Sequence, residues 1–397
     1  MNDRERSPLR RAACSLSDMP ALTDGCPNMS CARACGLARA APWRTALVAL
    51  LALLACAEPP QEVPRSAPAA DRWDDSRRDS LIAAMPGLLA QHRVPGASIA
   101  LVARGEVVWT ASFGVASPAG DSVRDATVFE AASLGKPVFA SLVALWAART
   151  DRSLEDSIAR WLPDGAAGPA PDATMSTLLS HTAGLVYDPQ ADRVRRDPER
   201  VGRWAYSGAG YALAQRAFEA ASGTSFTALA DSLLFAPLGL AHTDWTPPSG
   251  GAVARGHDRA GRVLDPTPFP TAVAGSSLHT TAREYAQLLL HLVGETPRPA
   301  VSFAPLRQAR APVDTALALH WGLGWALETR PDAAATAFHW GSNPGFKSLA
   351  FFDPVRQLGL VVLTNGDHGL ELIEDMVALL DPQPHAMFGF YMLHPDD

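Results

Sequence analysis

Strand-like segments lie at both ends of the region after residue 75, and helix-like segments lie between them. Their apolar patterns predict two strands joined at Arg104-Gly105, and further strands at 321–329, 337–346, 347–354 and 358–366. Helical spacing of apolar residues predicts helices at 77–92, 134–149, 211–223, 225–239 and 370–380. This order favours one sheet assembled from both ends of the chain. We therefore predict an α/β (α+β) domain in which helices flank the sheet and form a helical subregion.

The N-terminal part has the pattern of an export signal. Arg44 precedes an apolar run from Ala46 to Ala55, which is shorter than the roughly 20 residues that span a bilayer but suits the core of a signal peptide. The run ends at Cys56 in a sequence that resembles the lipobox of bacterial lipoproteins. We predict that residues 1–56 are a signal peptide and that Cys56 is lipidated, with ordinary cleavage beside this cysteine as the alternative.

A lipidated Cys56 would bind the protein to a membrane. Ala57 is not the aspartate that typically retains such lipoproteins at the inner membrane, so the resemblance implies an outer-membrane anchor facing the periplasm if the source has two membranes. The segment before the apolar run is long for a signal peptide, which makes Met29 an alternative start. The remaining chain is divided by composition into a Pro/Ala-rich tether, a folded domain and a C-terminal tail, at 57–75, 76–384 and 385–397.

Charge and cysteine content exclude other classes of protein. The chain has 34 basic and 41 acidic residues, and removal of the first 56 residues leaves 27 and 37, which gives no electrostatic reason to bind nucleic acid. All the cysteines lie in those first residues, and Cys26, Cys31 and Cys35 lack the C-x-x-C pairing of zinc sites. The histidines have no metal-ligand spacing, and nucleotide-binding glycine motifs are absent from the sequence. We predict no metal and no cofactor.

Lysine occurs only at Lys136 and Lys347 among the 34 basic residues. A GC-rich coding sequence would explain this bias without a functional cause, but each remaining lysine is then informative. Ser133 lies three residues before Lys136, so a helical turn would bring the hydroxyl to the amine, and Pro137 places the pair near a helix start. A buried lysine can lose its proton and activate a serine, whereas an arginine cannot. A chance S-x-x-K has odds of about one in eight, so the interpretation depends on companion motifs.

Four further motifs follow in order. They are TLLSHTAGL, YSGAGYALAQ, FHWGSNPGFKS and VVLTNGD, at 177–185, 206–215, 338–348 and 361–367. Together with S-x-x-K they resemble the serine β-lactamase and penicillin-binding protein family, in particular its branch of class C β-lactamases, D-alanyl-D-alanine carboxypeptidases and carboxylesterases. The resemblance covers about residues 77–380. It implies a β-lactamase/transpeptidase-like fold with an antiparallel sheet, and catalysis through an acyl-enzyme.

The resemblance also implies roles for individual residues. Ser133 matches the acylated nucleophile, Lys136 its proton acceptor, and Tyr206 the tyrosine that carries protons to and from the leaving group. The third motif, expected on an edge strand beside the serine, contributes substrate-binding positions and one oxyanion N–H. These positions are His339, Trp340, Gly341 and Ser342, and the N–H groups of Ser133 and Ser342 are expected to form the oxyanion hole. His181 is expected to be structural.

Two positions depart from the family pattern. Gly208 replaces an asparagine whose amide contacts the lysine and a substrate amide, and Trp340 replaces a threonine that helps to hold a substrate carboxylate. Trp340 would instead stack on an apolar acyl group if its ring faced the cleft. We therefore expect an exported, esterase- or peptidase-like serine hydrolase acting on a small ester, amide or β-lactam. The alternatives are a D-Ala-D-Ala carboxypeptidase or β-lactamase, or a non-catalytic lipoprotein that binds penicillin or peptidoglycan.

Overall fold

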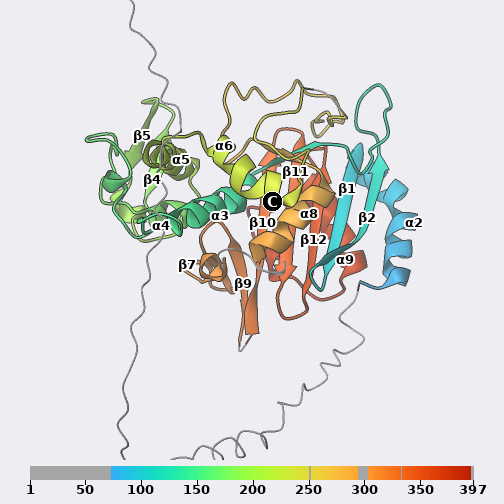
Figure 1. Cartoon of the computed structure of the whole chain (residues 1–397). Coiled ribbons are helices and arrows are strands. Elements are labelled where there is room, and N and C mark those ends of the chain that lie inside the picture. Colours follow the sequence, from blue (N-terminus) through green and yellow to red (C-terminus); the bar gives the residue numbers. More distant parts are fainter. Residues whose placement is uncertain (1–72, 250–251, 294–302, 332, 395–397) are drawn as a thin grey trace, which may run out of the picture. The chain divides into compact units, whose positions relative to one another are not determined.

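The computed structural model describes residues 73–249, 252–293, 303–331 and 333–394 (Figure 1). The predicted signal peptide, the lipobox at Cys56, the alternative start at Met29 and most of the predicted tether lie outside these residues. The described chain forms one eight-stranded sheet, and every neighbouring pair of its strands is antiparallel. The order across the sheet is β2 (Glu106–Gly114), β1 (Gly96–Ala103), β12 (Leu358–Thr364), β11 (Phe346–Asp353), β10 (Ala333–Asn343), β9 (Ala326–Arg330), β8 (Leu319–Trp321) and β7 (Ala311–Asp314).

The sheet confirms the expectation that both chain ends build it. β1 lies between β2, from the start of the domain, and β12, from its end, with Ala97 opposite Thr364 in the register. β1 is buried along its whole length, which agrees with its continuous apolar sequence. The predicted strand at 321–329 is wrong in part: Gly324 has a φ of 80°, and a turn from Gly322 to Trp325 separates β8 from β9.

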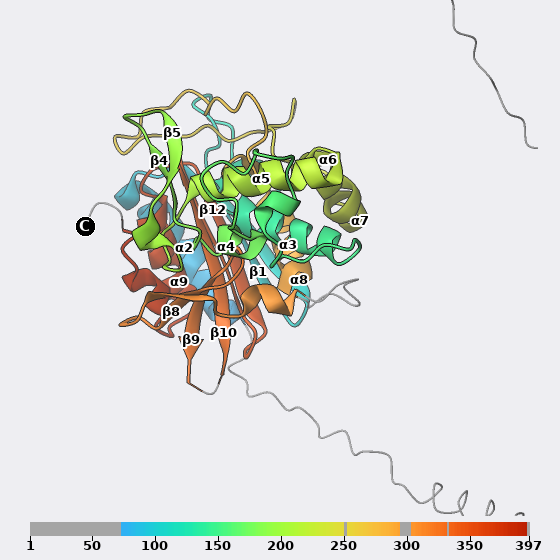
Figure 2. The same cartoon turned by 90° about the vertical axis from the view of Figure 1, so that its left-hand side faces the viewer.

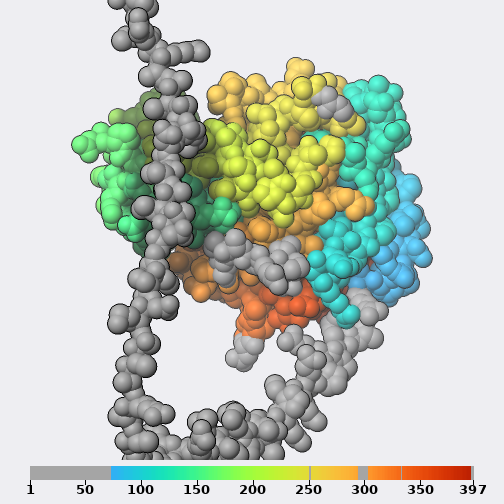
Figure 3. All heavy atoms as spheres, in the orientation of Figure 1, coloured from blue at the N-terminus to red at the C-terminus, as the bar shows by residue number. Residues whose placement is uncertain are grey.

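Helices cover both faces of the sheet. α2 (Asp75–His92) and α9 (Gly369–Leu380) pack against each other on one face. α8 (Ala282–Val293), which the sequence analysis did not identify, lies across β1, β2 and β12 on the other face (Figures 1 and 2). Figure 3 shows the segment between α7 and α8, in yellow and amber, over the upper part of this second face. That segment supplies one contact of the site described below.

A helical region lies beside the sheet. Its helices are α3 (Gly135–Ala147), α4 (Met175–Leu179), α5 (Gly208–Ser222), α6 (Phe226–Ala230) and α7 (Ala236–Leu238). A π-helical stretch at Asp231–Phe235 joins α6 to α7, and Pro237, which has no N–H to donate, explains why the α-helical pattern is interrupted there. Two short strand pairs complete the region, namely β3 (Phe129–Ala132) with β6 (Leu278–Thr280), and β4 (Leu185–Asp188) with β5 (Arg193–Arg196).

The folded domain extends beyond both predicted boundaries. Trp73, in the predicted tether, is buried, and its indole N–H donates to the carbonyl oxygen of Val102 at 2.9 Å. The residues after 384, predicted to be a tail, enter the core that α2 and α9 share with the sheet: Met387, Phe390 and Leu393 are at most 1% exposed. These apolar side chains gain more from burial than the segment would gain by remaining solvated.

Candidate active site

A tight turn carries the predicted nucleophile. Ser133 lies between the end of β3 at Ala132 and the start of α3 at Gly135, so it precedes the helix instead of lying within it. Ala132 has a φ of 53°, in the left-handed region that costs a residue with a side chain energy, and such strain is typical of functional sites. The N–H of Lys136 closes the turn by donating to the carbonyl oxygen of Ser133 at 2.9 Å. The turn leaves the Ser133 side chain partly exposed.

Lys136 is buried behind this serine. Its Nζ donates to Ser133 Oγ at 2.9 Å and to the carbonyl oxygen of Gly275 at 2.6 Å. Burial lowers the pKa of the Lys136 ammonium to about 7, so the amine is substantially neutral near neutral pH and can accept the serine proton. Gly275 lies in the segment between α7 and α8, and no side-chain pattern in the sequence reveals a backbone acceptor of this kind.

Tyr206 completes the set of three predicted catalytic residues. It precedes Ser207, whose Oγ caps α5 by accepting the N–H of Gly210 at 3.0 Å. Lys136 Nζ lies 4.9 Å from the centroid of the Tyr206 ring. Burial raises the pKa of the Tyr206 phenol well above its usual value, and hydrogen bonding to the Ser133 side chain opposes this only in part. Tyr206 therefore keeps its proton at neutral pH and can donate it.

His181 supports the position of Tyr206. Its Nδ1 accepts the N–H of Ser207 at 3.0 Å, and its ring lies 4.5 Å from the Tyr206 ring, centroid to centroid. Burial, followed by the nearby charge of Lys136, holds the pKa of the His181 imidazole well below its usual value. The neutral His181 imidazole therefore holds the backbone of Ser207 in place, as expected for a structural histidine. It does so directly beside Tyr206.

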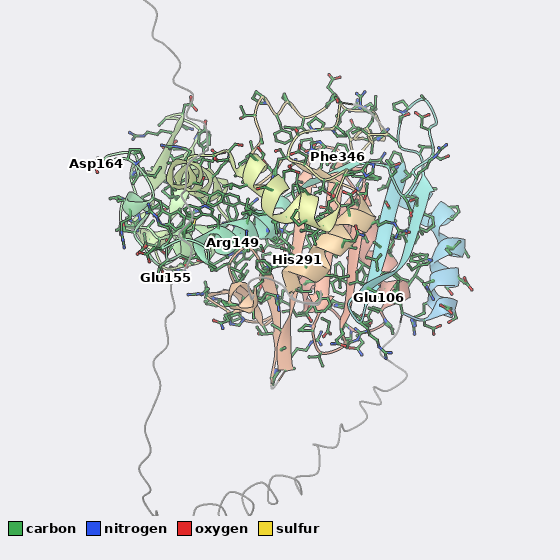
Figure 4. The ribbon with its side chains drawn as sticks, viewed as in Figure 1. Glu106, Arg149, Glu155, Asp164, His291 and Phe346 are labelled. Atoms are coloured by element: carbon green, nitrogen blue, oxygen red, sulfur yellow. The ribbon has the colours of Figure 1, made fainter. Side chains whose placement is uncertain are left out.

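β10 is not an edge strand of the sheet, because it lies between β9 and β11. Its pairing with β9 ends at Phe338, however, so residues 339–343 have a strand partner only on the β11 side. Figure 4 labels Phe346, where β11 begins, at one end of the sheet and Glu106 at the other end. The stretch of β10 that lacks a β9 partner thus lies at the Phe346 end. The expected edge therefore exists locally, because β10 continues beyond the end of its pairing with β9.

Gly341 allows β10 to approach the nucleophile turn. A Cβ at this position would lie 2.3 Å from the carbonyl oxygen of Ala131 and 2.2 Å from Ser348 Oγ, so any side chain would clash. Ser348 Oγ donates to the same Ala131 oxygen at 2.9 Å, which fixes β11 against β3. β10 and β3 are therefore in contact, and Ser342, the next residue along β10, is exposed.

His339 and Trp340 do not offer their side chains to solvent. His339 is fully buried, its Nδ1 donates to the carbonyl oxygen of Trp340 at 2.7 Å, and burial lowers its pKa to about 3, so it is neutral. Trp340 is only 3% exposed and stacks on Tyr206, with ring centroids 5.7 Å apart and an interplanar angle of 29°. The condition under which Trp340 would stack on an acyl group is therefore not met, because its ring is buried and packed against Tyr206. Gly208 is exposed, and a Cβ there would have no atom of the described residues within 4 Å.

The geometry is that of a serine hydrolase that uses a lysine as its base. A family model described as Beta-lactamase matches residues 79–380, and the chain belongs to this family. The predicted resemblance and the predicted β-lactamase/transpeptidase-like fold are thereby confirmed, and members of this family are serine hydrolases.

The names of individual relatives indicate different activities. The chain is 29% identical to penicillin-binding protein 4 of Amycolatopsis lactamdurans over 329 residues, which are 73% of this chain and 85% of that protein. It is 39% identical to esterase EstB of Burkholderia gladioli over 105 residues, 25% of this chain and 26% of the esterase. A β-lactamase/D-alanine carboxypeptidase structure from Pseudomonas syringae has a TM-score of 0.68 at 19% identity, covering 78% of this chain and 100% of that chain, and shows the shared fold.

The described residues show neither a metal site nor a membrane span. Groups of three or more His, Cys, Asp or Glu side chains in a metal-binding arrangement do not occur among them. Within the same residues, the helices are too short or too polar to cross a membrane.

Proposed function

We propose that this protein is a serine hydrolase that works through an acyl-enzyme and prefers small esters to β-lactams and D-alanyl peptides. The observation that supports this most directly is the hydrogen bond from Lys136 to Ser133, made by a buried amine whose pKa is about 7. A lysine kept only for its charge would be paired with a carboxylate, as Lys347 is with Asp367 at 2.6 Å. Lys136 contacts a hydroxyl and a carbonyl instead.

The proposed reaction assigns one step to each group. Neutral Lys136 accepts the hydroxyl proton as Ser133 attacks the substrate carbonyl carbon, and the N–H groups of Ser133 and Ser342 stabilise the oxyanion. Tyr206 passes a proton to the oxygen of the leaving alcohol when the bond to the acyl carbon breaks. Lys136 then passes the proton it accepted to the Tyr206 phenolate, which restores the neutral amine and the phenol. In deacylation, water attacks the acyl carbon and gives a proton to Tyr206 as Tyr206 gives its own to Lys136. Lys136 then protonates the Ser133 oxygen as its bond to the acyl carbon breaks and the acid is released.

The preference for esters follows from what surrounds these groups. Gly208 offers no side-chain amide, and Trp340 offers no hydroxyl and has its ring against Tyr206. An ester needs the nucleophile, the oxyanion donors and a proton for its alcohol, whereas β-lactams and peptides benefit from groups that hold an amide and a carboxylate. The local similarity to an esterase supports this choice.

We also propose that the protein is exported and anchored to a membrane through a lipidated Cys56, facing the periplasm. The support is the apolar run that ends at this cysteine, together with the buried Trp73, which allows the preceding residues to serve as a tether.

Intact-mass spectrometry tests the central proposal. The protein is exposed separately to a fluorophosphonate, a penicillin and a 4-nitrophenyl ester. We expect a stable fluorophosphonate adduct, a short-lived acyl adduct from the ester, and no adducts with Ser133→Ala. A long-lived penicillin adduct without ester turnover would instead support the non-catalytic binder. Rapid penicillin turnover that exceeds ester turnover would support a β-lactamase.

A further inference from the structure

Tyr206 lies in a cluster of aromatic side chains collected from distant parts of the chain. Its ring contacts the rings of Trp204, Trp321, Trp340 and His339, with centroid separations between 5.7 and 6.5 Å. Its hydroxyl hydrogen-bonds to the side chain of Ser133, which becomes acylated in the proposed reaction. The orientation of the phenol therefore depends on how its ring is packed.

Two rings lie close to parallel with Tyr206: Trp340 at 5.7 Å and 29°, and His181 at 4.5 Å and 32°. Trp321 meets the same tyrosine edge-on at 5.8 Å and 79°. Trp340 is the one of these two rings that comes from β10. Offset stacking adds to the energy of simple burial and restricts the tilt of the two rings. Trp340 occupies the position where the family pattern has threonine, and a threonine side chain has no ring to stack on the tyrosine.

The C-terminal segment also contacts Trp340. Phe390 is 1% exposed and meets Trp340 edge-on, with centroids 5.5 Å apart and an angle of 79°. It also contacts Trp204 at 5.9 Å, and Trp204 in turn contacts Tyr206. A chain of packed rings thus runs from Phe390 through Trp340 to the catalytic phenol.

We propose that Trp340, held in place by Phe390, is a positioning residue for Tyr206 and that it determines how well the enzyme expels poor leaving groups. This inference rests on the proposed function. A misplacement of about 1 Å can lower a rate by about 10²-fold when a proton has to be transferred in the transition state. The effect depends on the substrate, because an alkoxide must be protonated as it leaves whereas 4-nitrophenolate leaves without a proton.

The test compares two acetate esters on the same variants. The kcat/KM values for 4-nitrophenyl acetate and ethyl acetate, which report acylation, are measured for the wild type, Trp340→Phe, Trp340→Thr and Phe390→Leu. We expect Trp340→Thr to lower the value for ethyl acetate at least about tenfold more than the value for 4-nitrophenyl acetate. Trp340→Phe keeps a stacking ring, so it should retain most of the kcat/KM for ethyl acetate that Trp340→Thr loses. Phe390→Leu should lower kcat/KM for ethyl acetate selectively, but by a smaller factor than Trp340→Thr.

Phe351→Leu is the matched control. Phe351 is fully buried in the same core cluster as Trp340, and its ring contact is with His385 instead of Tyr206. This variant should change kcat/KM for both esters by the same factor. Thermal unfolding checks that each variant is folded. Equal losses for both esters in Trp340→Thr, or no loss, would overturn the inference. Labelling of Ser133 by a fluorophosphonate is measured in parallel, so a failure of the proposed function is recognised separately as an unlabelled wild type.

Discussion

The nucleophile turn and the aromatic cluster around Tyr206 are built in opposite ways. Ser133 and Lys136 are three residues apart, and their hydrogen bond follows from one turn of backbone at the start of α3. The aromatic cluster joins Trp321, Trp340 and Phe390 to the segment that carries Tyr206. The first region is polar and local, and the second is apolar and depends on the whole fold. The chemistry of the site can therefore be recognised from a short motif, whereas its fine positioning cannot.

The two regions are nevertheless coupled through Lys136. Its Nζ lies 4.9 Å from the Tyr206 ring and 5.4 Å from the Tyr211 ring, and burial is the cause of its lowered pKa. The aromatic surroundings supply the low dielectric that makes the amine a base. A local motif thus acquires its reactivity from residues that are distant in sequence.

The largest effect should come from breaking the local region. Lys136→Arg keeps a cation but removes the group that can lose a proton, so the acylation rate should fall by about 10² to 10⁴. Stopped-flow acylation with 4-nitrophenyl acetate measures this. Lys347→Arg is the matched control, since Lys347 pairs with Asp367 and needs only its charge. Near-normal turnover by Lys136→Arg would refute the assigned base.

Adding a polar side chain at Gly208, the first residue of α5, should have the next largest effect. Gly208→Asn supplies the amide of the family pattern, and the open space at this position accommodates it. A hydrogen bond to a charged group contributes about 1.5 to 3 kcal/mol, or roughly 10- to 150-fold, so the preference for 4-nitrophenyl acetate over nitrocefin should shrink by up to this factor. Gly208→Ala is the control, and kcat/KM is the measurement. If the wild type already hydrolyses nitrocefin better than the ester, the predicted preference is wrong.

The coupling between the regions should appear in the pH dependence. Because only neutral Lys136 accepts the serine proton, kcat/KM for an uncharged ester should fall about tenfold per pH unit below pH 7 and level off above it. Tyr206 remains protonated throughout this range, because burial raises its pKa. A wild-type midpoint close to the ordinary lysine pKa would contradict the burial argument.

The smallest effect on activity is expected from the predicted anchor. Cys56→Ser should convert a membrane-bound, detergent-requiring protein into a soluble periplasmic one, while leaving kcat/KM unchanged because both regions of the site lie after residue 73. Fractionation and assay of the two proteins measure this. The same distribution for both proteins would refute lipidation at Cys56.

Much of the architecture was predictable because its signals are local. Apolar periodicity located β1, β2, β10, β11, β12, α2, α3, α5 and α9, and their order along the chain predicted a sheet built from both ends. The pattern missed α8 and merged β8 with β9, since a buried glycine turn at Gly324 is hard to distinguish from a strand by apolar content. It also ended the domain too early, because short apolar segments such as 386–393 show their role only when they meet a partner surface.

The sequence by itself determined the reacting groups: a serine and a lysine at helical spacing, and a tyrosine in a second motif. Only the tertiary structure decided how these groups behave. It gave Lys136 the carbonyl oxygen of Gly275 as a second partner, and it buried Trp340 with its ring stacked on Tyr206. The physical reason is that identity and spacing are properties of the chain, whereas burial, dielectric and ring stacking arise only when distant segments are packed together.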